Sequence, residues 1–257
     1  MNKYLARCGV ASRRKANVTI AQGRIIVNNC RIKDIGLEVD PQKDRIYLDG
    51  HPLAFPEHFS YILMNKSKGV ITAVEDDRGR KTVLDFISVK DRIFPVGRLD
   101  YDTEGVLLLT NDGELAYRLT HPKYNVEKVY RTWVEGHVSN DKIRNLTRGV
   151  EIDPGMIVKG ESEILKKRLN QTLVEIRVHE GKKRQIKRMM KSIGHPVLYL
   201  ERSRFAGLTV DDLQRGQWRE LTEIEVNSLY RQTGLKGMLY EPDKCSVRLK
   251  REENNSS

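Results

Sequence analysis

Cysteine is scarce in this chain of 257 residues, which contains only three. Cys8, Cys30 and Cys245 lie far apart and form no CxxC pair, so we expect neither a disulfide framework nor a zinc site. The sequence also lacks any run of 18 apolar residues, and its N-terminus lacks the long apolar stretch of a secretory signal. We therefore expect a cytoplasmic protein with no membrane segment.

Cofactor and metal motifs are missing as well. The sequence has no P-loop and no GxGxxG motif, and its histidines show no metal-ligand spacing. Residues 100–105, DYDTEG, imitate the opening of a calcium loop, but Asn111 stands where that loop needs a bidentate glutamate. We therefore expect a protein without metal or cofactor, whose chemistry depends on its own side chains.

Acidic residues are absent from two stretches of an otherwise mixed sequence. The 46 Lys and Arg exceed the 35 Asp and Glu and give a formal net charge of +11. Residues 1–33 contain Lys3, Arg7, Arg13, Arg14, Lys15, Arg24, Arg31 and Lys33. Residues 182–191 contain Lys182, Lys183, Arg184, Lys187, Arg188 and Lys191. Because ordinary solvated surfaces mix both signs, these stretches predict a nucleic-acid partner rather than a membrane surface.

The first 52 residues have the features of a small separate domain, followed by a linker over 53–59. Ser12 is a suitable cap for a helix over 13–22, which Gly23 ends. Two short strands around an Asn-Asn turn then predict a hairpin. Arginines at the start of a helix, beside a hairpin, suit contacts with RNA phosphates.

Residues 60–233 predict a larger domain. Apolar stretches over 61–64, 93–96, 106–109, 128–134 and 172–179 indicate strands, whereas helices are expected over 114–119, 140–147 and within 181–194. Because strands and helices are mixed without regular βαβ alternation, the expected fold class is α+β. Residues 234–257 are expected to form a loosely ordered tail.

The most informative stretch is GRLDYDTEGVLLLTNDG, at residues 97–113. A short loop presents Asp100 between Arg98 and a Thr-Glu-Gly turn, and four apolar residues then lead into a buried strand. A polar loop joined to a core strand holds its side chains in fixed positions. Catalysis requires such positions, and a loop surrounded by solvent does not provide them. Asp100 is therefore the leading candidate for a reactive group.

Within 181–194 the apolar and basic residues fall on opposite stripes of a helix. The apolar stripe contains Ile186, Met189, Met190 and Ile193, and the basic one contains Arg184, Lys187, Arg188 and Lys191. The basic face follows directly after an expected core strand, where a site can be built.

Two parts of the sequence resemble known families. LARCGVASRRKA, GRIIVN and VDPQKDRIYLDG resemble the small RNA-binding domain known as the S4 domain. GRLDYDTEGVLLLTNDG, EKVYRTWVEG and EGKKRQIKRMMKSIGHPV are similar to the three signature regions of bacterial ribosomal RNA pseudouridine synthases of the RsuA type. Together they cover residues 2–230 in the expected order. They imply a mixed, mainly antiparallel sheet flanked by helices, with an active cleft across it.

This resemblance implies three catalytic residues. Asp100 would be the catalytic aspartate, acting as nucleophile or as the base that starts the reaction through the sugar. Lys187 would stand against that carboxylate, where many relatives have arginine, and would offer a point charge instead of a two-pronged clamp. Tyr130 would pack against the target uracil.

The resemblance also implies residues that bind RNA or shape the loop. Arg98 would fill the base stack when the nucleotide is flipped out, and Thr103 and Gly105 would shape the loop. The expected phosphate contacts of the larger domain are Lys128, Arg184 and Arg188. Those of the N-terminal domain are Arg7, Arg13, Arg14, Lys15 and Arg24.

The stretches GELA at 113–116 and GQWREL at 216–221 most resemble enzymes that act on large-subunit ribosomal RNA. We therefore expect a monomer that isomerises a uridine of that RNA without a cofactor. One alternative is a synthase for small-subunit ribosomal RNA. Another, of a different class, is a non-catalytic ribosome-assembly factor that binds ribosomal RNA.

Overall fold

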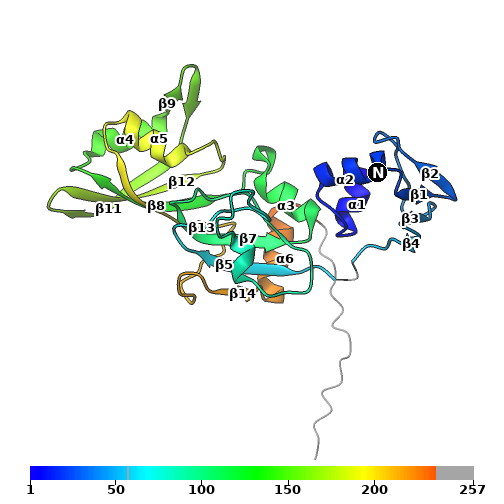
Figure 1. Cartoon of the computed structure of the whole chain (residues 1–257). Coiled ribbons are helices and arrows are strands. Elements are labelled where there is room, and N and C mark those ends of the chain that lie inside the picture. The colour runs from blue at the N-terminus through cyan, green and yellow to red at the C-terminus, as the bar shows by residue number, and fades with distance from the viewer. Residues whose placement is uncertain (57, 236–257) are drawn as a thin grey trace, which may run out of the picture.

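The computed structural model describes residues 1–56 and 58–235, so most of the tail expected over 234–257 lies outside the described residues. Two bodies of secondary structure are joined by the chain that follows β4 and precedes β5 (Figure 1). Among the helices that the structure describes, none has the length and apolar content needed to cross a membrane.

Two helices and a four-stranded antiparallel sheet form the N-terminal unit. Its elements are α1 (Asn2–Arg7), α2 (Arg13–Ala21), β1 (Ile25–Val27), β2 (Cys30–Ile32), β3 (Ile46–Leu48) and β4 (His51–Pro52), with strand order β2-β1-β3-β4. The Ser12 side chain accepts a hydrogen bond from the Lys15 amide and so caps α2. Asn28 and Asn29 have φ values of 49° and 69°, which a tight hairpin turn requires. The expected helix and hairpin are both present.

The chain after β4 stays attached to this unit. Leu53 donates its amide hydrogen to the first carbonyl of β3 over 2.8 Å. The Phe55 ring lies 4.8 Å from that of Tyr4, and the Arg7 guanidinium stands 4.0 Å above it. The beginning of the segment expected as a linker therefore packs against the N-terminal unit.

An eight-stranded mixed sheet is the framework of the larger unit (Figure 1). Its strands are β5 (Tyr61–Lys66), β6 (Phe94–Pro95), β7 (Glu104–Thr110), β8 (Lys128–Glu135), β11 (Glu161–Arg168), β12 (Gln171–Val178), β13 (Val197–Phe205) and β14 (Trp218–Glu220). The order is β11-β12-β8-β13-β7-β5-β14, and β6 pairs with β7. Among the named strands, the one parallel pair joins β13 to β7. The expected α+β class with a mainly antiparallel sheet is confirmed.

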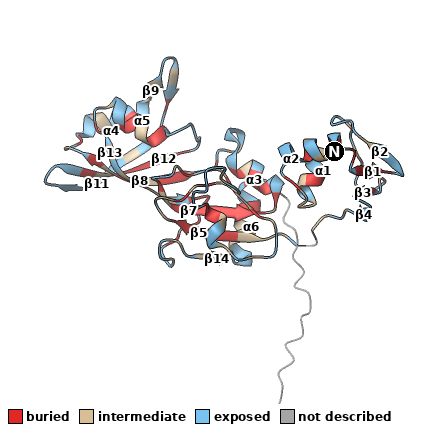
Figure 2. Cartoon of the chain, in the orientation of Figure 1, coloured by how far each residue is buried: buried red, intermediate tan, exposed pale blue. Residues whose placement is uncertain are grey.

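Helices cover the sheet in two groups (Figure 2). They are α3 (Gly113–Thr120), α4 (Asn140–Arg148), α5 (Gln185–Ser192) and α6 (Glu223–Gln232), with the short 3-10 helices η1 (Val83–Phe86) and η2 (Pro122–Tyr124). A separate hairpin consists of β9 (Val150–Asp153) and β10 (Met156–Val158). Leu119 and Leu229 pack α3 and α6 onto β5 and β7, whereas Ile143 and Met189 pack α4 and α5 onto β8 and β12. The larger unit therefore has two packed halves.

Strand β7 is covered on both faces. Val106 and Leu108 belong to the core shared with α3 and α6, whereas Leu107 and Leu109 belong to a second core that includes Val83 of η1. Successive side chains of a strand point to opposite faces, so a doubly covered strand needs a continuous apolar run. This burial anchors the loop that immediately precedes β7.

Candidate active site

The loop that carries Asp100 is fixed to the core at both ends. Buried Leu99 precedes the aspartate, and its carbonyl accepts a hydrogen bond from Thr72 Oγ1 over 2.8 Å. The Thr103 amide donates to the Asp100 carbonyl over 3.0 Å and closes a turn before β7 begins. The Asp100 side chain stays about one-third exposed. The loop thus presents a carboxylate on a backbone that cannot easily move.

Lys66 lies beneath this loop, and the sequence analysis missed it. Its side chain is fully buried, and Nζ donates to the carbonyl oxygens of Ser67, Asp100 and Thr103 over 3.0, 3.2 and 2.8 Å. Burial lowers its pKa to about 8, although Glu104 and other nearby carboxylates oppose this shift. In the sequence, Lys66 is recognisable only as a charged residue at the end of an apolar strand. A surface lysine can have the same position, so this pattern does not identify a buried one.

Lys66 predicts a pH-dependent stability. Its pKa falls from 10.5 in an exposed chain to about 8 in the folded one, so between these values unfolding takes up a proton. The free energy of unfolding should therefore increase with pH across this window. Below about pH 8 the lysine is charged in both states, and the cost of burying that charge lowers the stability in full. Urea unfolding of the wild type and of Lys66→Met, measured across the window, should show a smaller rise in the variant. Equal slopes would contradict the assignment.

Gly105 is required by the close approach of two strands. Its φ is +101°, and a Cβ atom there would clash with the Arg202 carbonyl oxygen and lie 3.0 Å from the Arg202 backbone nitrogen. Gly105 and Arg202 are register partners in the parallel pair of β7 and β13. No other residue allows this pairing without displacement of the backbone.

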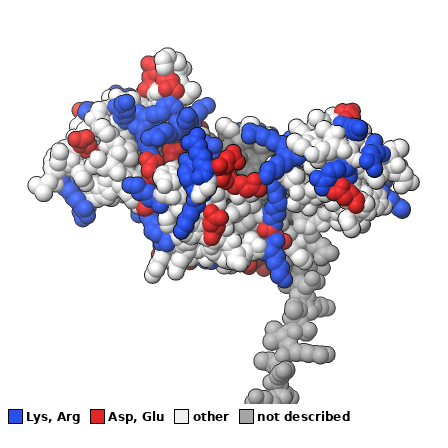
Figure 3. Space-filling model, in the orientation of Figure 1, with Lys and Arg blue, Asp and Glu red and all other residues white. Residues whose placement is uncertain are grey.

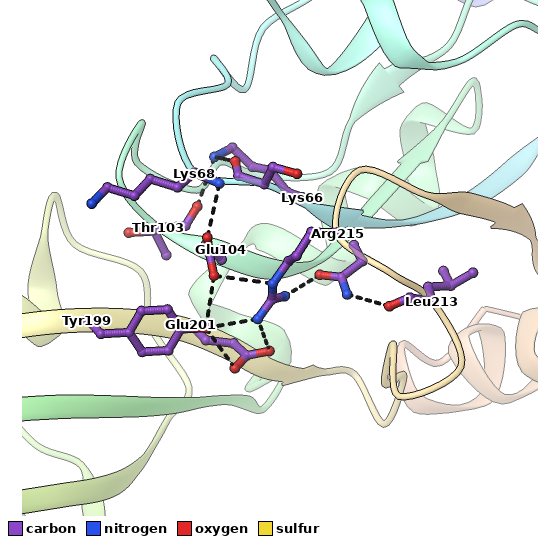
Figure 4. Close-up of polar contacts among 10 residues, drawn as sticks. Lys66, Lys68, Thr103, Glu104, Tyr199, Glu201, Leu213 and Arg215 are labelled. Atoms are coloured by element: carbon purple, nitrogen blue, oxygen red, sulfur yellow. Dashed lines mark hydrogen bonds and ion pairs between the residues drawn. The ribbon is translucent and has the colours of Figure 1, made fainter.

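The residue between the loop and Gly105, Glu104, lies in a polar network (Figure 4). Its carboxylate lies 3.2 Å from Arg215 Nε and accepts a hydrogen bond from Tyr199 Oη over 2.9 Å. Arg215 also pairs with Glu201 over 2.9 Å and donates to Asn65. The segment before β14 is thereby tied to β5, β7 and β13. This network fixes the position of Glu104, which directly follows the Asp100 loop. No local sequence pattern predicted it.

Asp100 opens onto a cleft of about 260 Å³. Arg98, Asp100 and Thr103 line it from the loop before β7, Tyr130 lines it from β8, and residues 180–186 line it from the segment that leads into α5. Arg184 is among these lining residues. The structure therefore brings together candidates from the three signature regions.

Lys187 approaches the loop from α5. Its Nζ lies 3.9 Å from Asp100 Oδ2 and forms a closer hydrogen bond with Asp102 Oδ1. Burial acts to raise the pKa of Asp102, but the hydrogen bond to Lys187, together with the positive charges of Lys187 and Arg184 and a backbone hydrogen bond, lowers it overall. The expected approach of Lys187 to Asp100 is present, although the lysine is shared. Asp102 is a partner that the sequence analysis did not assign.

Tyr130 lies where the two halves of the larger unit meet, since it packs against the cores of both. Its register partner on β13 is Arg202, which is 2% exposed and donates Nε to the Val106 carbonyl over 2.9 Å. Burial lowers the pKa of the Arg202 guanidinium, and the adjacent Tyr130 opposes this shift. Arg202 is a second buried cation that the sequence analysis missed.

Lys128, expected to contact a phosphate, is buried and bonded within the protein. The lysine is 7% exposed, and its Nζ donates to the carbonyl oxygens of Val126 and His179 over 2.9 and 3.4 Å. Burial lowers its pKa to about 8. A lysine at a strand start is usually exposed, but here the segment that follows β12 covers it.

Arg188 is also engaged within the protein. Its guanidinium pairs with Asp153 and donates to the carbonyl oxygens of Lys183 and Ile152 over 2.9 and 3.2 Å. These contacts connect α5 to β9. They use most of the hydrogen-bond donors of the guanidinium, so few are left for a phosphate. Figure 3 shows many Lys and Arg side chains over the region of α4 and α5. Of the three expected phosphate contacts of the larger domain, Arg184 is the one that lines the cleft, beside Lys182 and Lys183.

The basic residues of the N-terminal unit differ in their partners. Arg24 pairs with Asp49 over 2.5 Å, and Lys15 pairs with Glu75 of the larger unit over 2.5 Å. Arg13 and Arg14, at the exposed start of α2, form no ion pair within residues 1–56 and 58–235. They are the cations of this helix that are most available to a polyanion.

Comparison with known proteins agrees with this arrangement. The family of RNA pseudouridylate synthases matches residues 60–192, and the S4 domain matches residues 2–46. Over 232 residues the chain is 41% identical to ribosomal large subunit pseudouridine synthase B of Bacillus subtilis, covering 89% of this chain and 94% of that protein. It is 40% identical over 238 residues to an uncharacterized RNA pseudouridine synthase of Aquifex aeolicus, covering 92% of this chain and 95% of that protein.

A solved structure shares the fold. The crystal structure of a pseudouridylate synthase aligns with a TM-score of 0.65 at 27% identity and covers 89% of this chain and 98% of its own. The match of residues 60–192 to the synthase family agrees with the two relatives, which align over nearly their whole length. The S4 domain adds an RNA-binding unit. This chain belongs to the RNA pseudouridine synthase family and carries an S4 domain at its N-terminus.

Proposed function

We propose that this enzyme isomerises a uridine of large-subunit ribosomal RNA, with Asp100 as the catalytic group and without a cofactor. The observation that carries the proposal is the position of Asp100 in the cleft, with Tyr130 among the other lining residues and Lys187 Nζ 3.9 Å from its carboxylate. These groups come from β8, α5 and the loop before β7. Their convergence is what a reaction based on side chains alone would need.

The reaction breaks the bond between C1′ of the ribose and N1 of uracil, rotates the base and joins C1′ to C5. The proton that C5 loses is balanced by the one that N1 gains, so no oxidant or reductant is consumed. An ionised Asp100 would either attack C1′ or take a proton from the sugar. Lys187 would keep that carboxylate ionised after the substrate has displaced water from the cleft.

The target nucleotide would leave the base stack to reach Asp100, because a cleft of about 260 Å³ is far too small for a duplex. Arg98, exposed at the cleft, would fill the space that the extruded base leaves. Tyr130 would pack against the uracil ring during its rotation. Arg184 at the cleft and Arg13 on α2 would contact phosphates.

The choice of large-subunit RNA is supported by the name of the B. subtilis relative at 41% identity. Residues 216–221 agree with it, because they resemble the corresponding stretch of large-subunit enzymes. Small-subunit ribosomal RNA is the alternative substrate, and an assembly factor without activity is the alternative of another class. We expect the enzyme to act as a monomer.

Pseudouridine mapping tests the proposal. A strain without this protein should lack one pseudouridine of large-subunit RNA, and the purified enzyme should restore it on a large-subunit transcript but not on a small-subunit one. Loss of a small-subunit pseudouridine instead would favour the alternative substrate. Unchanged maps together with defective ribosome assembly would favour the non-catalytic factor.

A further inference from the structure

A cluster of aromatic side chains lies on the surface where α3 ends and η2 follows. The ring of Tyr117 lies 5.0 Å from that of His121 and 6.1 Å from that of Tyr124, and His121 and Tyr124 lie 6.3 Å apart. We call Tyr117, His121 and Tyr124 the aromatic rim. None of these residues has a part in the reaction described above.

The aromatic rim is exposed and carries positive charge. Tyr117 is 46% exposed and His121 is exposed, although burial of an aromatic ring would normally stabilise the fold. Lys123 Nζ lies 4.8 Å from the Tyr124 ring centre and Arg118 Cζ lies 5.3 Å from it. Since these cations occupy Tyr124, the rings left open to a ligand are Tyr117 and His121.

The rim is also held in a fixed orientation. His121 Nδ1 accepts a hydrogen bond from the Lys123 amide over 3.2 Å, which restrains the ring. Tyr117 stands on α3, whose capping Asp112 accepts hydrogen bonds from Glu114 and Leu115 amides. A rigid ring loses little conformational entropy when a ligand stacks on it.

Two contacts connect the rim to the cleft. Thr120, at the end of α3, packs against Gly97, where a Cβ would lie 3.4 Å from Thr120 Cγ2, and the next residue, Arg98, lines the cleft. The carbonyl oxygen of Asn125, after η2, accepts a hydrogen bond from His179 Nδ1 over 2.9 Å. The neighbours of His179, at positions 178 and 180, line the cleft too. The helix and turn that carry the rim are therefore connected to two of the segments that line the cleft.

We propose that the aromatic rim is a subsite for an unpaired nucleobase of the substrate RNA, close in sequence to the target uridine. The base would stack on Tyr117 and His121, and Lys123 would contact its phosphate. This rests on the proposed function, because the occupant is the RNA that enters the cleft. Aromatic rings among cations are the surface that unpaired nucleic acid favours, since every base has a face to stack.

Replacing Tyr117 tests the subsite. Tyr117→Ala should weaken binding of a large-subunit RNA transcript and raise its KM by about tenfold or more, with kcat within about twofold of the wild type. Tyr117→Phe, which keeps the ring, should behave as the wild type. Tyr117→Leu, which keeps apolar volume without the ring, should resemble Tyr117→Ala. The dependence of binding on salt should not change, because no phosphate contact is removed.

Equal affinity of all three variants would overturn the subsite, as would a loss in kcat without a change in binding. Circular dichroism of each variant establishes that α3 is intact. Because affinity is measured separately from turnover, a wild-type enzyme that binds the transcript but does not modify it would contradict the proposed substrate. The comparison of variants would still decide whether the rim binds RNA.

Discussion

Asp100→Asn should abolish pseudouridine formation while RNA affinity falls by less than about tenfold, or roughly 1.4 kcal/mol. The amide has nearly the same shape as the carboxylate but cannot ionise, so it can neither attack C1′ nor take a proton. The fold should persist, because Lys187 keeps its closer partner, Asp102. The pseudouridine content of the transcript after incubation, measured beside filter binding of the same RNA, gives both quantities.

Asp102→Asn is the matched control. It removes a carboxylate that also contacts Lys187, from a position two residues away in the same loop. It should retain measurable turnover, because Asp102 is not among the residues that line the cleft. If Asp100→Asn were active and Asp102→Asn inactive, the catalytic assignment would have to move to Asp102.

Gly105→Ala should lower the free energy of unfolding by at least about 3 kcal/mol and remove most activity. The new methyl group would overlap the Arg202 carbonyl oxygen and would also force alanine to a φ of +101°. Relief requires β7 and β13 to move apart, which would displace the loop that carries Asp100. Denaturant unfolding and turnover of the variant measure the two effects.

Gly113→Ala provides the comparison for this prediction. Gly113 is the first residue of α3, its φ is not positive, and a Cβ there would meet nothing within 4 Å. Alanine favours a helix more than glycine does, so stability should stay the same or rise by up to about 1 kcal/mol. Similar stability of the two alanine variants would show that Gly105 is not under the constraint described.

Local patterns predicted the parts of the site that a short stretch of sequence determines. The apolar run at 106–109 follows from a strand covered on both faces, and the stripes of 181–194 follow from the helical repeat of α5. Asp100 stood out because a polar loop met that strand. The family resemblance supplied Tyr130 and Lys187, which no local pattern distinguishes from ordinary strand and helix residues.

Long-range polar contacts were beyond such patterns. Lys66, Arg202 and Arg215 all hold groups near the Asp100 loop, and each has a partner there that lies 34 or more residues away in the chain. A charged residue in an apolar strand gives no sign of whether it points to water or to a carbonyl. The burial of Lys128 was not predicted for the same reason, since the segment that covers it follows a different strand.

The parallel pair of β7 and β13 has a consequence for how this enzyme could acquire new substrates. Two residue pairs form that ladder, and Arg202 and the Arg215 network add polar contacts beside it. A few point substitutions between β7 and β13 could alter the angle between the two halves of the larger unit without changing the residues of either hydrophobic core. Relatives could thus diverge in the RNA shape that they accept, provided that the close approach of Gly105 to Arg202, and with it the loop that carries Asp100, is kept.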